Sequence, residues 1–149
     1  MRRLALVIFL VGCTAVENEP LPDPRAMLDE PAFECKVEPI LVKQCSYLGC
    51  HGVAESALRV YSPGKLRATV PTSNDEAYAP LTMNEHVANY NIAAGFAVNT
   101  APADNWLLLK PLPATLGGYE HKGGEIYTGT SDPQFTAIFN WLKGSKSCN

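Results

Sequence analysis

The sequence predicts a mainly α-helical domain in which three to five short helices are joined by long irregular loops. Helix start and stop signals recur along the chain, as capping residues or prolines before apolar runs and as glycines or prolines after them. The chain also holds 12 prolines and 11 glycines, which interrupt regular elements, and only 18% of its residues are charged. Its 149 residues suffice for one domain with appendages.

The first 12 residues are typical of a bacterial export signal. Arg2 and Arg3 form a basic region, and an apolar run over residues 4–11 follows. This run is too short to span a bilayer. The segment ends in Leu-Val-Gly before Cys13, which resembles the lipobox of bacterial lipoproteins. The resemblance implies that Cys13 is lipidated and becomes the first mature residue, while an ordinary signal peptide with an incidental cysteine is the alternative.

The mature protein is expected to be acidic and anchored to a membrane by its lipid. Removing residues 1–12 takes away two of the 12 basic residues against 15 acidic ones, so the net charge moves from −3 to −5. Nucleic acid is not an expected partner, because phosphate binding requires a basic face. Cys13 is followed by Thr14 and not by Asp, which resembles the lipoproteins that Gram-negative bacteria sort to the outer membrane. We therefore expect the domain to be anchored there, facing the periplasm or the cell surface.

Residues 13–32 are expected to form an extended tether between the lipidated cysteine and a folded domain over residues 33–149. The tether is rich in prolines and acidic residues and has too little apolar material to fold alone, as shown by Pro20, Pro22, Pro24, Pro31, Glu17, Glu19, Asp23, Asp29 and Glu30.

The first helix is predicted over residues 38–46. Pro39 suits the first helical position, where its missing N–H costs nothing. Residues 57–61 form a short extended segment that ends at a Ser-Pro-Gly turn, and residues 65–76 form a loop with at most one helical turn.

Two further helices are predicted in the middle of the chain. Thr82 and Glu85 form a capping-box pattern, so a helix should run over residues 83–94 with one apolar face. That face is made of Val87, Tyr90 and Ala94. Asp104 is expected to cap a short buried helix over residues 105–110, which Pro111 and Pro113 terminate.

The last helix is predicted over residues 133–143, after a glycine-rich loop over residues 112–130 that holds a short strand at 125–128. A capping residue followed by proline marks its start. Its apolar stripe comprises Phe135, Ile138, Phe139 and Leu142, and Gly144 is the stop signal.

One motif carries a specific chemistry. Cys45 and Cys50 are separated by four residues, and His51 follows directly, with Gly49 and Gly52 giving backbone freedom on both sides. C-type haem attachment needs this residue set: two sulfurs for the porphyrin vinyl groups and an adjacent imidazole for the iron. The alternatives are a Cys45–Cys50 disulfide with a surface histidine, or a zinc site that includes a second histidine.

The motif resembles the haem-binding site of c-type cytochromes, in a rarer C-x4-C-H form. The resemblance covers roughly residues 33–148, because an apolar run precedes the motif, and Trp106–Pro111, a His-Lys-Gly-Gly segment at 121–124 and a terminal helix follow it in order. It looks like the small single-haem domains of bacterial exported lipoproteins. It implies a cytochrome c-like fold around one covalent haem c bound by Cys45, Cys50 and the axial ligand His51.

The resemblance also implies the second axial ligand and a disulfide. In class I cytochromes that ligand comes from a loop before the last helix, where this chain offers His121 and no methionine. Met83 and His86 are the competing candidates. The first and last helices of that fold pack together, which implies that Cys35 and Cys148 form a disulfide in an oxidising exported compartment.

The expected function is therefore electron transfer rather than catalysis. A haem with two protein axial ligands has no open position and favours outer-sphere transfer between redox protein partners. The main alternative is a haem-free, disulfide-stabilised exported interaction domain. A peroxidase or sensor with an open axial site is a third reading.

Overall fold

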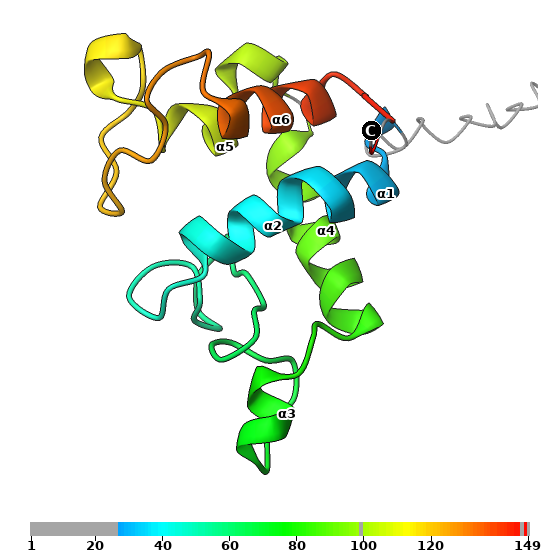
Figure 1. Ribbon diagram of the computed structural model, residues 1–149. Coiled ribbons are helices and arrows are strands. Elements are labelled where there is room, and N and C mark those ends of the chain that lie inside the picture. The colour runs from blue at the N-terminus through cyan, green and yellow to red at the C-terminus, as the bar shows by residue number, and fades with distance from the viewer. Residues whose placement is uncertain (1–26, 99, 147, 149) are drawn as a thin grey trace, which may run out of the picture.

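The computed structural model describes residues 27–98, 100–146 and 148. The export signal, the lipidated Cys13 and most of the tether predicted from the sequence lie outside the described residues. Within them the fold is a small mainly α-helical domain with long irregular connections and no strand (Figure 1). No helix in this part of the chain has the length and apolar character needed to cross a membrane.

The first helix is longer than predicted and begins at Glu30. It runs without a break through α1 (Glu30–Ala32), the π turn η2 (Phe33–Val37), α2 (Glu38–Ile40) and the π turn η3 (Leu41–Cys45). The start is set by Asp29, whose side chain accepts a hydrogen bond from Ala32 N at 2.8 Å, with proline in the first turn. The folded chain thus includes the end of the segment expected to be a tether.

Pro39 lies inside this helix rather than at its start. A proline in a helix interior removes one backbone hydrogen bond and crowds the preceding turn. Here it lies between two wide π turns, η2 before it and η3 after it, and wide turns are a common way of absorbing such a defect. The second π turn ends on Cys45, so the helix delivers this cysteine directly into the motif.

The predicted capping box is confirmed at the start of α4 (Met83–Ala97). Thr82 accepts a hydrogen bond from Glu85 N, and the Glu85 carboxylate accepts one from Thr82 N at 2.8 Å. The helix continues to Ala97 rather than ending near 94. Its buried positions are Glu85, Asn89, Ala93, Ala94 and Ala97, whereas Val87, predicted to be on the apolar face, is exposed. A short helix, α3 (Asn74–Tyr78), precedes it where one helical turn at most was expected.

The short third helix is present as α5 (Trp106–Leu109), after a 3-10 turn at Pro102–Asp104. Its cap is Asn105 rather than the predicted Asp104: the Asn105 side chain accepts a hydrogen bond from Leu107 N. Leu107 and Leu108 are buried, but Trp106 is 57% exposed, so the helix is only partly inside the core.

The last helix, α6 (Pro133–Leu142), follows the predicted start and stop signals. The Asp132 side chain accepts from Gln134 N, and Gly144 takes a left-handed conformation at φ 83° just after the helix. The buried face of α6 includes one residue that was not predicted. Trp141 is nearly fully buried there, together with Phe135 and Ile138.

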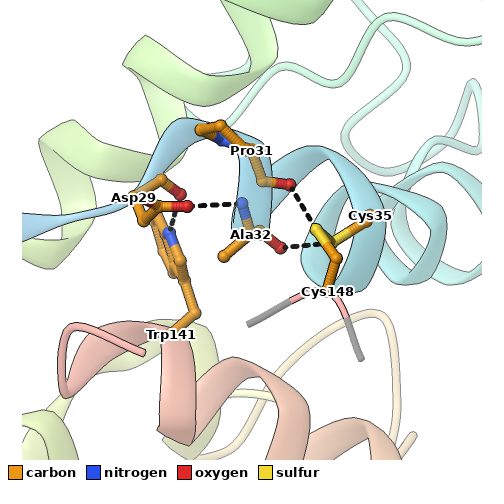
Figure 2. Close-up of a disulfide and its surroundings, with 6 residues drawn as sticks. All are labelled: Asp29, Pro31, Ala32, Cys35, Trp141 and Cys148. Carbon is orange, nitrogen blue, oxygen red and sulfur yellow. Dashed lines mark hydrogen bonds between the residues drawn. A yellow bond between two sulfur atoms is a disulfide. The ribbon is translucent and has the colours of Figure 1, made fainter. Parts of the chain in front are cut away.

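The first helix lies between α6 and α4, and this contact forms the centre of the core (Figure 1). The Phe33 ring lies 5.3 Å from the Trp141 ring and 5.7 Å from the Tyr90 ring, measured between centroids. Figure 2 shows Trp141 Nε1 directed at the carbonyl of Asp29, to which it donates at 3.0 Å. These contacts explain why the helix begins so early: its first turn packs against the last helix.

The structure contains the expected disulfide between Cys35 and Cys148, drawn in Figure 2. It joins two residues 113 positions apart, one in the first helix and one beyond the last. The predicted strand at 125–128 is absent. Instead, Ile126 N and Tyr127 N both donate to the carbonyl of Pro111, so the segment is fixed by a turn-like contact and not by a ladder.

Candidate functional site

A cavity of about 210 Å³ lies next to the motif. Its lining is mostly apolar, and two imidazoles, one thiol and one ammonium group contribute to it. The lining comes from several parts of the chain: Leu41, Cys45, His51, residues 56–58, Phe96, Trp106, Leu107, Lys110, Pro111, His121 and Tyr127. Cavities of this kind, apolar with a few convergent polar groups, are typical of cofactor and ligand sites.

Two histidines that are distant in the sequence meet at this cavity. The rings of His51 and His121 lie 5.9 Å apart between centroids, and their planes differ by only 14°. His51 Nδ1 is hydrogen-bonded to Ser56 Oγ at 3.0 Å, a contact that orients the ring. Burial lowers the pKa of His51, and the nearby His121 lowers it further, against a smaller opposing effect of the Leu58 backbone. These effects favour the neutral imidazole, the form that binds metals.

His121 has no polar partner at its buried nitrogen. Its Nδ1 atom is inaccessible to solvent and has no hydrogen-bond partner in the described part of the chain. Gly123 makes room for the ring, because a Cβ atom at that position would lie 2.6 Å from His121 Cε1. The glycine next to it, Gly124, adopts φ 78° and turns the chain. The loop is thus shaped to place this imidazole at the cavity.

The two cysteines of the motif differ in environment. Cys45 is buried and lines the cavity, and burial raises the pKa of its thiol to about 11, together with the effect of Cys50 and against that of Lys65. Cys50 is exposed and does not line the cavity. Both thiols are free, so the disulfide considered as an alternative for this pair is absent.

Backbone hydrogen bonds close the loop between the cysteines. The Tyr47 carbonyl accepts from Cys50 N at 2.8 Å and from Gly52 N at 3.0 Å, and His51 N donates to the Cys45 carbonyl at 3.1 Å. Gly52 is required here, because an added Cβ atom would lie 2.0 Å from the Ser46 carbonyl oxygen. Gly49, by contrast, has open space around its Cα.

The competing iron ligands lie elsewhere. Met83 is 71% exposed at the start of α4, and His86 is hydrogen-bonded through Nδ1 to the carboxylate of the buried Glu38. Neither residue lines the cavity. Of the three candidates for a second axial ligand, only His121 is brought to His51.

Sequence reasoning missed several residues of the site. Ser56, Phe96 and Tyr127 line the cavity without any local signal that predicts it. Tyr127 is almost fully buried, its hydroxyl donates to the Leu107 carbonyl at 3.2 Å, and burial raises its pKa strongly, with smaller contributions from Cys45 and Asp132. It therefore serves as an uncharged wall of the cavity.

The donor set suits a haem better than a bare metal ion. In the described residues no group of three or more histidine, cysteine or acidic side chains is placed to hold a metal, so the zinc reading lacks ligands. A porphyrin supplies four of the ligands of its iron and needs only two from the protein. His51 and His121 are the two imidazoles that line this cavity, and their rings stack with centroids 5.9 Å apart.

Comparison with known proteins gives no further guide. No family model, no curated protein and no solved structure matches this chain.

Proposed function

We propose that this protein is a monohaem c-type cytochrome that carries electrons between redox partner proteins. The observation that carries the proposal is the parallel pair His51 and His121 at an apolar cavity that Cys45 also lines. Cys45 and Cys50 would hold the haem covalently, with His51 and His121 as axial ligands. When bound, the haem supplies a one-electron couple of iron.

The protein's own residues would control that couple. Two neutral imidazoles give a lower potential than a histidine–methionine pair, because methionine ligation raises it. The Ser56 hydroxyl orients His51, and the apolar walls limit the access of water to the site. If His51 and His121 both held the haem iron, no open position would remain for a substrate, so we propose an electron carrier and not an enzyme.

Covalent haem attachment would require the Cys50 side chain to change its orientation. This side chain is exposed and lies outside the cavity lining, next to His51 in the chain. Cys45 and Cys50 must both face the porphyrin edge for two thioether bonds to form. We therefore expect the Cys50 side chain to turn toward the cavity during maturation, while the loop backbone keeps His51 in place.

The proposed location is a bacterial membrane, reached through lipid on Cys13, with the domain facing the periplasm or the cell surface. The support is the sequence of residues 1–13 alone. Labelling with a radioactive fatty acid tests it: wild-type protein should incorporate label into the membrane fraction, and Cys13→Ser should not. Equal labelling of both proteins would remove the lipid anchor from the proposal.

Spectroscopy of the haem-loaded protein separates electron transfer from the other readings. A six-coordinate, low-spin spectrum that does not change on adding carbon monoxide or cyanide is expected, together with reversible reduction by a small-molecule donor. A high-spin spectrum that shifts with added ligand would instead favour a sensor or peroxidase. Protein that takes up no haem in a host competent for cytochrome c maturation would leave the haem-free interaction domain as the better reading.

A further inference from the structure

The loop between the two cysteines is long, and of its side chains only Ser46 is buried. Tyr47 is 54% exposed and Leu48 is 64% exposed, so neither packs into the core. Fixing each added residue of such a loop costs conformational entropy, which contacts from outside the loop help to offset. The contact that the structure offers comes from Lys65, in a segment beyond the motif.

The Lys65 ammonium reaches three groups at the start of this loop. Its Nζ donates to Ser46 Oγ at 2.9 Å and to the Val42 carbonyl at 3.4 Å, and it lies 4.0 Å from the centroid of the Tyr47 ring. Ser46 is fully buried and itself donates to the Val42 carbonyl. A hydrogen bond from a charged donor is stronger than one between neutral groups. The cation–π contact with the Tyr47 ring adds a second attraction.

These contacts fix the residue on which the rest of the loop depends. The Tyr47 carbonyl accepts the backbone hydrogen bonds of both Cys50 and Gly52, the two neighbours of His51. Holding Tyr47 therefore holds the backbone on each side of His51. Lys65 is in turn fixed through its own backbone, which donates to the Ser62 carbonyl at 3.2 Å.

We propose that Lys65 is a positioning residue that clamps the C-x4-C-H loop, so that His51 faces the cavity and the two cysteines keep their register. This proposal rests on the proposed function for its meaning, but the clamp itself is a property of the protein without haem. Lys65 does not touch the cavity, and it acts only through Ser46 and Tyr47.

Three variants test the clamp. Lys65→Met removes the charge and keeps the length of the side chain, and Lys65→Arg keeps the charge. Lys43→Met is the matched control, because Lys43 is exposed two residues before Cys45 and its side chain makes no hydrogen bond or ion pair within the described residues. It also changes the net charge by the same amount.

The first measurement is amide hydrogen exchange in haem-free protein, at Cys50 and Gly52. Lys65→Met should speed exchange of these two amides about tenfold, as expected for losing a hydrogen bond from a charged donor. Lys65→Arg should restore most of the protection, and Lys43→Met should exchange like wild type. Unchanged protection in Lys65→Met would overturn the proposal. If that variant does not fold, Tyr47→Leu, at an exposed side chain, should speed the same amides, and unchanged protection there would overturn it equally.

The second measurement is the haem content after maturation in a competent host. We expect Lys65→Met to carry several-fold less covalent haem than wild type, or to show a mixture of low-spin and high-spin signals, whereas Lys43→Met matches wild type. Equal loading and identical spectra would show that the clamp does not serve haem attachment. Failure of the wild type to take up haem would count against the proposed function, while the exchange experiment would still decide on the clamp.

Discussion

The imidazole rings of His51 and His121 lie parallel at the edge of one apolar cavity, 5.9 Å apart between centroids. They come from the end of the cysteine motif and from a glycine-rich loop that is far away in the sequence. Neither ring is part of an ion pair in the described chain. The two rings stack on one another, and both line the cavity at which we propose that a haem is held.

Replacing His121 tests its proposed role as the second iron ligand. In His121→Ala we expect haem-loaded protein to lose its low-spin spectrum and to bind added carbon monoxide, because one axial position opens. Met83→Ala is the control and should keep the wild-type spectrum, since Met83 is 71% exposed and does not line the cavity. A low-spin spectrum and unchanged potential in His121→Ala would assign the ligand to another residue.

The Gly123→Ala variant tests how the loop positions His121 without removing the imidazole. The new Cβ atom would lie 2.6 Å from His121 Cε1, so the ring must move. We expect part of the haem to become high-spin while the melting temperature changes little, because the clash is with a side chain near the surface. Gly95→Ala is the control: no atom lies within 4 Å of its added Cβ. Wild-type spectra for both variants would contradict this account of the loop.

Reducing the Cys35–Cys148 disulfide should destabilise the domain strongly. The bond joins residues 113 positions apart, so opening it returns the entropy of a large loop to the unfolded chain, worth up to roughly 4 to 5 kcal/mol. Urea unfolding of wild type with and without reductant, beside the double variant Cys35→Ser/Cys148→Ser, measures the loss. The double variant should be insensitive to reductant. Equal unfolding midpoints for wild type under both conditions would show that the bond contributes nothing.

Acid should weaken the fold through Glu85. Burial alone would raise the pKa of this carboxyl, but hydrogen bonds from Arg67, Thr82 and the Ala68 backbone outweigh it and lower the pKa to about 2. A carboxyl whose pKa is lowered on folding stabilises the protein above its unfolded value of 4.5, and this contribution is lost as the pH falls toward about 2. The loss amounts to at most about 3 kcal/mol.

Urea unfolding at about pH 6 and about pH 3 checks this dependence. Glu85→Gln should be less stable than wild type near neutral pH, because Arg67 is buried beside it and loses its ion pair at 2.8 Å. The same variant should lose less stability on acidification. Glu55→Gln, at an exposed position, serves as the control and should follow wild type. Parallel pH profiles for Glu85→Gln and wild type would exclude Glu85 as the source.

The sequence predicted those helix starts whose capping residues lie within a few positions of one another. The capping box of Thr82 and Glu85 and the Asp132–Pro133 helix start are complete within a few positions, so the sequence alone locates both helices. The early start of the first helix was missed, because Pro31 and Pro39 each suit the first turn of a helix. The contact between Asp29 and Trp141, which the sequence does not reveal, places the start at the earlier proline.

The sequence identified two histidines of the cavity but not its walls. The cysteine motif points to His51, and the resemblance to class I cytochromes points to His121. The structure brings these two rings together, whereas their binding to iron stays a prediction. Ser56 and Tyr127 reach the cavity through the path of long loops, for which no periodicity exists. Lys65 was missed for the same reason, since its contact with Ser46 spans 19 positions of irregular chain.

The central claim is that one haem is held covalently at this cavity, and the mass of the denatured protein tests it most directly. Wild type and Cys45→Ser/Cys50→Ser are matured in the same competent host, denatured in guanidinium and measured by mass spectrometry. We predict that the wild-type polypeptide retains the mass of one haem and that the double variant retains none. A wild-type mass equal to the bare polypeptide, with both thiols intact, would contradict the account.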